Sequence, residues 1–146
     1  MAQTTGAMTG AVATLEINVN NSTWVSIAGS TQSVDSVDFA VVRGNRGTLD
    51  GATNIILTGR QEETTVTVNA LYTEVADEAL LKAIGSIKNN YPCNVRWSPA
   101  GAGGATYTTQ NGLVSNVQLP NADSSAGEPL MFSLTILCGG IATSIS

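Results

Sequence analysis

Paired carboxylates are the residues of this sequence whose type and spacing come nearest to catalytic chemistry. Glycosidases use two such groups, one as an acid and the other as a base or nucleophile. The candidate groups are Glu62 with Glu63, Asp35 with Asp38, and Glu74 with Asp77 and Glu78. All of them fall in predicted turns or at a predicted helix start, where acidic residues are common for local structural reasons. We therefore expect no catalytic carboxylate pair.

A nucleophile with a matching base is also missing. The chain contains no histidine, which removes the commonest general base and the commonest metal ligand. Ser26, Ser30 and Ser33 therefore have no histidine to activate them. A serine–lysine pair with Lys82 or Lys88 is conceivable, but both lysines are expected on the solvated face of a helix. The sequence predicts that the protein is not an enzyme.

Metal and cofactor motifs give no positive signal. The stretch DGATN at residues 50–54 lacks the closely spaced series of oxygen ligands with a following glutamate that a calcium loop needs. The glycine-rich stretch 98–105 lacks the Lys-Ser/Thr ending of a phosphate-binding loop. Cys93 and Cys138 lie in apolar strand patterns without metal-ligand spacing. We expect no metal and no cofactor, and two buried free thiols, with a disulfide as the alternative.

Charge and composition argue against a further class of function. The net charge is −5 and the isoelectric point is near 4.4, whereas a protein that grips nucleic acid phosphates needs a basic surface. The 146 residues are 42% hydrophobic, which is enough for the core of one domain. Only 12% are charged, about half the usual share. A polar but weakly charged surface on a β-rich chain often lies against partners.

Most of the elements predicted from hydrophobic periodicity are strands. Residues 13–19, 66–72 and 130–138 alternate apolar and polar side chains, as half-buried strands do. Shorter strands are expected at 24–27, 37–41, 55–58, 93–97, 107–109 and 113–119, the last two as a hairpin around Asn111-Gly112. The predicted fold class is mainly β, a β-sandwich or flattened barrel of about eight strands.

One flanking α-helix, at about residues 74–89, interrupts this pattern. Thr73 can cap its start, and Pro92 follows its end. Its apolar side chains recur with helical spacing at Ala76, Ala79, Leu80, Ala83, Ile84 and Ile87. Two roles for the helix are compatible with this pattern: it covers the outer side of the sandwich, or it plugs the end of a barrel.

The longest polar stretch is RGNRGTLDGATN at residues 43–54. It predicts a long hairpin loop or a loosely ordered tongue, and loops of this length are usually functional or disordered. We expect a single β domain at residues 13–138, a flexible N-terminal arm at 1–12 and a C-terminal tail at 139–146. Neither a secretory signal nor a membrane span is predicted, so assembly in a cytosol is expected.

The order of these elements carries a family resemblance. A strand with WVSIAG at residues 24–29 precedes the long polar loop. LTGRQEE at 57–63, a Thr/Val strand and the helix with DEALLKAI at 77–84 follow it. In the order of its elements, in its size and in the general character of its sequence, the chain resembles the tail tube protein (major tail protein) of long-tailed bacteriophages. The resemblance covers most of residues 13–138.

The resemblance implies a structural subunit that forms hexameric rings. The rings would stack through head-to-tail interfaces into a hollow tube, with strands of all six subunits joined in one inner barrel. Tail initiator and terminator proteins would be partners, and phage DNA would pass through the lumen without specific binding. The implied location is the virion tail, assembled in the host cytoplasm.

Two sets of site residues follow from the resemblance. The long loop would reach the adjacent ring, with contacts from Arg43, Asn45, Arg46, Asp50 and Asn54. One polar strand face would line the channel, where acidic and neutral side chains repel or ignore DNA phosphates. The lumen-facing residues expected are Thr14, Glu16 and Asn18.

Two alternatives stay open from the sequence. The chain could be the tube protein of a contractile tail or of a type VI-like secretion machine. It could also be a β-sandwich binding or capsid-decoration module with an aromatic, sugar-binding platform. The aromatic residues available for such a platform, or for core packing, are Trp24, Trp97, Tyr72, Tyr91 and Tyr107.

Overall fold

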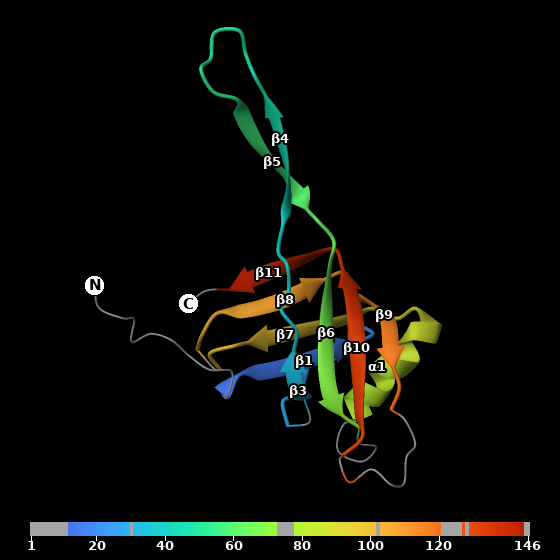
Figure 1. Ribbon diagram of the computed structural model, residues 1–146. Helices are drawn as coiled ribbons and strands as arrows, with labels where there is room; N and C mark the ends of the chain where they lie inside the picture. The colour runs from blue at the N-terminus through green and yellow to red at the C-terminus, as the bar shows by residue number, and fades with distance from the viewer. Residues whose placement is uncertain are drawn as a thin grey trace, which may run out of the picture.

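The computed structural model describes residues 12–29, 31–72, 78–101, 103–120, 127 and 129–144. These residues form eleven strands and one helix, so the expected mainly β fold with a single helix is confirmed (Figure 1). The strands are β1 (Thr14–Val19), β2 (Val25–Ser26), β3 (Thr31–Val34), β4 (Val41–Arg46), β5 (Ile55–Gln61), β6 (Thr64–Leu71), β7 (Cys93–Ser98), β8 (Thr106–Gln110), β9 (Leu113–Gln118), β10 (Met131–Cys138) and β11 (Gly140–Ser144). The helix is α1 (Glu78–Asn89).

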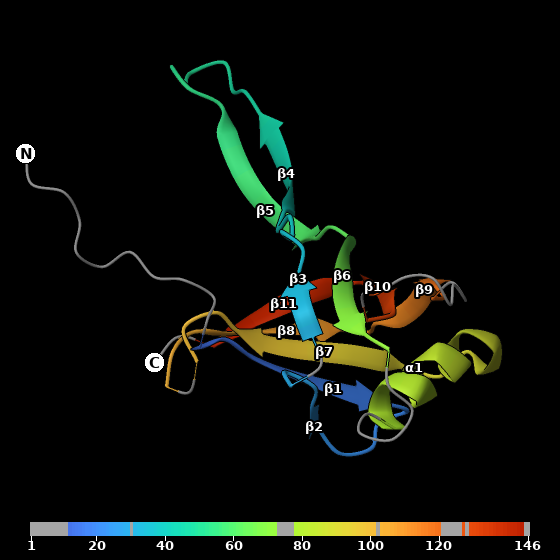
Figure 2. The ribbon, with the colours of Figure 1, turned by 60° about the horizontal axis from the view of Figure 1, so that its bottom comes forward.

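Nine of these strands build a sandwich of two antiparallel sheets. The first sheet has the order β11-β8-β7-β1-β2, and the second has the order β3-β6-β10-β9. The strands of one sheet run across those of the other, and neither sheet closes into a barrel in the described residues (Figure 2). β4 and β5 form a separate two-stranded hairpin that projects from the body.

The core lies between the two sheets and follows the predicted alternation. Leu15 and Ile17 of β1 are buried, as are Val68 of β6 and Leu134 of β10. β6 and β10 pair along eight residues in register, so their buried side chains share one face. The opposite face of β10 is only partly buried and Leu137 on it is exposed, as expected for a half-buried strand.

Helix α1 packs beside the sandwich against β1 and the edge strand β9. Ala83 and Ser86 are buried there, and the Ser86 hydroxyl donates to the Ala83 carbonyl at 2.6 Å. Ile87, which the sequence places on the apolar face, is 42% exposed, because a helix at the side of the sandwich buries only a narrow arc. The predicted cap at Thr73 and the first predicted residues of the helix lie outside the described residues.

The chain between residues 31 and 41 differs from the prediction. The expected strand at 37–41 is wrong: Thr31–Val34, a stretch of three polar residues and Val34, forms β3, and 35–40 are irregular. β3 pairs with β6 with a bulge between Thr31 and Ser33, and the Asp35 N–H donates to the Thr67 carbonyl at 3.0 Å. Backbone pairing with β6 therefore determines that residues 31–34 form a strand, although their side chains show no apolar alternation.

The expected hairpin around Asn111-Gly112 is also wrong. β8 lies in the first sheet and β9 in the second, so the turn joins the two sheets. Asn111 has a left-handed φ of 53°, which asparagine tolerates well. The Cys93 N–H donates to the Gly112 carbonyl at 2.9 Å, and the Gly112 N–H donates to Asn94 Oδ1 at 2.9 Å. These contacts with β7 hold in place the turn by which the chain passes from β8 in the first sheet to β9 in the second.

The C-terminal part of the chain belongs to the body. Residues 140–144, which the sequence assigns to a tail, form β11 and pair with β8 at the edge of the first sheet. Glycine and small residues there give a weak strand pattern, and the backbone of β8 supplies the hydrogen bonds that order them.

Candidate functional site

The β4–β5 hairpin stands out because the body does not cover it. Ile55, Ile56 and Leu57 are 53%, 67% and 68% exposed, although their sequence reads as a buried strand. A lone two-stranded hairpin is marginally stable in water, and adjacent exposed apolar side chains mark interaction surfaces. The hairpin is therefore a candidate contact element. The sequence predicts a loop at 43–54 followed by a strand at 55–58. The structure forms β5 from Ile55–Gln61, but it also forms β4 from Val41–Arg46, which the prediction of a loop missed.

Hydrogen bonds at its base fix the hairpin to the body. The Ile141 N–H of β11 donates to Gln61 Oε1 at 2.8 Å. The Glu62 N–H donates to the Ala40 carbonyl at 3.0 Å, and the Thr64 hydroxyl donates to the Asp38 carbonyl at 2.8 Å. The first bond joins β5 to the first sheet, the second closes the base of the hairpin, and the third joins β6 of the second sheet to the segment that leads into β4.

The strand register gives the hairpin two different faces. Gly44 lies opposite Leu57 and Arg46 opposite Ile55, and these four residues form what we call the Leu57 face. Arg43 opposite Thr58 and Asn45 opposite Ile56 form the Ile56 face. On the Ile56 face, Arg43 Nη1 donates to the Thr58 hydroxyl. The Leu57 face is the more apolar of the two, because Gly44 has no side chain that could cover Leu57 from the opposite strand.

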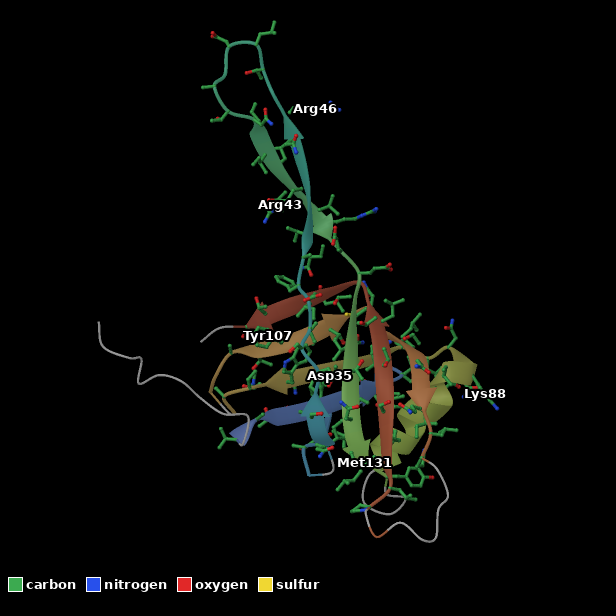
Figure 3. The ribbon with its side chains drawn as sticks, in the orientation of Figure 1. Asp35, Arg43, Arg46, Lys88, Tyr107 and Met131 are labelled. Atoms are coloured by element: carbon green, nitrogen blue, oxygen red, sulfur yellow. The ribbon has the colours of Figure 1, made fainter. Side chains whose placement is uncertain are left out.

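The five residues predicted for inter-ring contact all lie in this hairpin, Arg43 nearer its base and the other four farther out. Arg43, Asn45 and Arg46 are in β4, and Figure 3 shows the two arginines along it. Asp50 and Asn54 lie in the connection between the strands. All five are exposed, but the register sends Arg46 to one face and Arg43 and Asn45 to the other.

The polar face of β1 is where the sequence places Thr14, Glu16 and Asn18. These side chains lie on the opposite side of β1 from the buried Leu15 and Ile17, as expected from the alternation. Glu16 and Arg96 of β7 are cross-strand partners and form an ion pair at 2.5 Å.

Two further interactions surround this ion pair. The Arg96 guanidinium lies 4.5 Å from the centre of the Trp24 ring, a cation–π contact. The Oδ1 atom of Asn18 is buried and has no hydrogen-bond partner in the described part of the chain. The Glu16 carboxylate is thus locally compensated, so this face is polar with little net charge.

An apolar cleft of about 780 Å³ opens on the side of the sandwich away from α1. It opens beyond β3, the edge of the second sheet, and its lining includes Leu15, Trp97, Tyr107 and Ile141 of the first sheet and Val37 and Phe39 of the segment before β4. Leu15 and Ile141 are themselves buried, Trp97 and Tyr107 are partly buried, and Phe39 is exposed. The Trp97 and Tyr107 rings pack at 5.7 Å between centroids. Sequence reasoning missed this cleft, since its floor comes from four strands far apart in the chain.

The other predicted aromatic residues do not gather with these two. Tyr72 packs edge-on against Phe132 at 6.0 Å, Trp24 lies beneath Arg96, and Tyr91 is exposed near the end of the helix. Trp97, Tyr107 and Tyr72 are partly buried against the core. The five aromatic residues therefore form no common platform for a sugar.

The titratable and nucleophilic side chains give little chemistry. Cys93 and Cys138 are free and buried, as expected, and burial raises the pKa of the Cys93 thiol to about 12. Burial also raises the pKa of Cys138. Within the described ranges, no group of three His, Cys, Asp or Glu side chains could hold a metal ion. The described helix is too short to cross a membrane.

Comparison with known proteins gives matches at the level of structure. No family model and no curated sequence matches the chain. A chain of the anti-feeding prophage baseplate, a six-fold symmetrised structure, superposes with a TM-score of 0.66 at 12% identity, over 99% of this chain and 97% of that one. A chain in the tail of an empty gene transfer agent particle, computed with C6 symmetry, gives 0.64 at 10% identity, over 96% and 99%.

A chain of the sheath/tube terminator of the extracellular contractile injection system PVC gives a TM-score of 0.61 at 17% identity, over 89% of this chain and 92% of that one. These likenesses extend over nearly the whole chain in each case. The resemblance drawn from the sequence is thereby confirmed, and the chain has the fold found in the tail of a gene transfer agent and in contractile injection systems.

Proposed function

We propose that this protein is the structural subunit of a phage tail tube, which forms hexameric rings that stack around a channel for genome delivery. The observation that carries the proposal is the projecting hairpin on a fold shared with six-fold symmetric tail and baseplate structures. A hairpin with three exposed apolar residues has no partner of its own within the described body. Stacking of copies would supply that partner.

The inter-ring contact in this proposal is the hairpin. Arg43, Asn45, Arg46, Asp50 and Asn54 are all exposed there and contribute charge and hydrogen-bonding groups. Head-to-tail interfaces of this kind close into rings or continue as filaments, depending on the rotation between copies.

The polar face of β1 is the proposed lumen surface. Thr14, Glu16 and Asn18 present hydroxyl, carboxylate and amide groups, and Arg96 compensates Glu16 at 2.5 Å. A surface of this kind offers DNA phosphates no cluster of cations to bind, in keeping with the net charge of −5. DNA would therefore slide past it. Tail initiator and terminator proteins are the further partners proposed, and the virion tail, assembled in the host cytoplasm, is the proposed location.

Negative-stain electron microscopy of the purified protein at rising concentration, with light scattering for mass, tests this function. We expect rings or hollow tubes about 100 Å wide, the scale of six domains of this size around a channel. A protein that stays monomeric at every concentration, alone and with a tail initiator complex, would contradict the proposal.

A second candidate is the tube protein of a contractile machine. The likeness to the PVC sheath/tube terminator favours it, because that structure belongs to a contractile injection system. The two candidates differ in one partner: a contractile machine needs a sheath around the tube. Co-assembly of the tubes with a sheath protein encoded beside this chain would favour the contractile machine, and smooth bare tubes in complete particles would favour the first candidate.

A further inference from the structure

The apolar cleft lies where the two sheets of the sandwich differ in extent. The first sheet has five strands, and its end with Trp97, Tyr107 and Ile141 extends past β3, the four-residue edge strand of the second sheet (Figure 2). In the described residues β3 pairs on one side with β6 and has no strand on its other side. Leu15 and Ile141 are buried, but Trp97 and Tyr107 are only partly buried and Phe39 is exposed, so additional strands placed there would cover apolar surface.

The Leu57 face of the hairpin has the shape and polarity expected of strands that pack over this apolar cleft. It presents Ile55 and Leu57 on a flat backbone, because Gly44 opposite Leu57 has no side chain. The flat region ends at Thr58, because the register shifts between Val41 and Arg43 opposite Gly59 and Arg60. The hairpin also continues the direction of β6 out of the body, so it points along the strands of the second sheet (Figure 1).

Charge favours the same pairing. Residues 41–61 contain three arginines and one aspartate, a charge of +2, so the rest of the chain carries −7 of the total of −5. The residues that line the cleft are apolar or neutral except Asp35, which directly follows β3. Asp35 Oδ1 accepts a hydrogen bond of 2.9 Å from Asn69 Nδ2 on the outer face of β6, so any attraction for the basic hairpin comes from the acidic remainder of the chain and not from a charge inside the cleft. The Leu57 face carries Arg46 beside its apolar residues.

We propose that the cleft of one copy is the docking site for the Leu57 face of the hairpin of a second copy. The hairpin would lie beside the free edge of β3, pack Ile55 and Leu57 on the aromatic floor, and leave the Ile56 face toward solvent. This inference rests on the proposed tube function, since it names the acceptor surface for the stacking contact. It does not depend on the number of copies in a ring.

A matched pair of substitutions tests the face that docks. Leu57 and Ile56 are adjacent, apolar and almost equally exposed, but they point to opposite faces. Leu57→Lys should raise the protein concentration needed for assembly at least tenfold, while Ile56→Lys should change it less than threefold. Both variants should keep the circular dichroism spectrum and the unfolding midpoint of the parent. Equal effects of the two substitutions on assembly would overturn the proposal.

Cross-linking tests the acceptor. Leu57→Cys in one batch is mixed with a size-tagged batch that carries Thr143→Cys at the exposed rim of the cleft, and a short bis-maleimide is added. The native thiols are buried and give little background. We expect a product of the mixed size, and a yield several-fold lower when Ile56→Cys replaces Leu57→Cys or when Ser115→Cys on β9 replaces Thr143→Cys.

The outcomes separate the two proposals. Tubes seen by electron microscopy without the 57–143 product would overturn the docking site and leave the tube function standing. Monomers without any cross-linked product at every concentration would overturn both. A mixed product in discrete small oligomers that never become tubes would support the docking site and contradict the tube.

Discussion

The side-chain oxygen Oε1 of Gln61 accepts a hydrogen bond of 2.8 Å from the backbone N–H of Ile141. Gln61 is the last residue of β5, and Ile141 lies in the edge strand of the first sheet. The bond therefore joins the base of the projecting hairpin to a strand that is 80 residues away in the sequence. It fixes the direction in which the hairpin leaves the body.

Gln61→Ala should weaken this attachment. The Ile141 N–H loses its acceptor in a partly buried place, which costs about 1 kcal/mol of unfolding free energy. We also expect faster hydrogen exchange at Ile141 and a several-fold higher concentration for assembly. Gly140→Ala should act in the same direction, because a Cβ there would lie 2.5 Å from Gln61 Oε1. Gln118→Ala removes an exposed glutamine and serves as the control; equal effects in both variants would contradict the role of Gln61.

Replacing Arg43 and Arg46 by glutamate should leave the subunit folded and suppress long tubes. The double substitution makes the hairpin acidic, so it repels the acidic remainder of a second copy. Electron microscopy and light scattering measure the loss of tubes, and circular dichroism reports the fold. The matched control compares Arg46→Glu with Lys88→Glu, an equal charge change at an exposed helix position (Figure 3). Tubes of normal length from the double variant would refute this role of the arginines.

Gly112→Ala should destabilise the fold. A Cβ on Gly112 would lie 2.3 Å from the Cys93 carbonyl oxygen, so the crossing between the two sheets must move. We expect a loss of about 1–3 kcal/mol in unfolding free energy. Gly85→Ala is the contrasting substitution: its Cβ meets nothing within 4 Å on α1, and we expect a gain of about 0.5–1 kcal/mol. Denaturant unfolding measures both, and the prediction fails if the two changes have the same sign.

The two buried thiols predict a loss of stability at alkaline pH. Burial raises the pKa of Cys93 from 9.0 to about 12, so between these values the unfolded chain ionises while the folded chain stays protonated. The unfolding free energy is unaffected by this group below pH 9.0 and falls as the pH rises toward 12, by up to about 1.4 kcal/mol per pH unit. The difference in slope between the parent and Cys93→Ala isolates the thiol. Parallel pH curves would show that Cys93 does not titrate in this way.

The sequence predicts those parts of the fold that depend on neighbouring residues in the chain. The alternation in β1, β6 and β10 is recognisable because one face of each strand is buried in the core. β3 could not be predicted, because its hydrogen bonds come from β6 about 36 residues later. The apolar run at Ile55–Leu57 is read as a core strand by any local pattern, yet the body leaves it exposed.

The same division holds for the candidate site. The five hairpin residues could be identified together because they lie within one stretch of twelve residues, 43–54. The cleft could not, because Trp97, Tyr107 and Ile141 meet only through the sheet order β11-β8-β7. Local periodicity assigns a residue to a face of its strand, but it does not say which strand lies next to it.

The hairpin and the cleft are different surfaces of one chain, and this difference gives any assembly built from their contact a direction. Each added copy fills one surface of its neighbour and offers the other. One end of a finished filament then always displays free hairpins, and the opposite end always displays empty clefts. A protein that starts growth and a protein that stops it must consequently imitate two unlike surfaces, an apolar cleft and an apolar hairpin face that carries an arginine.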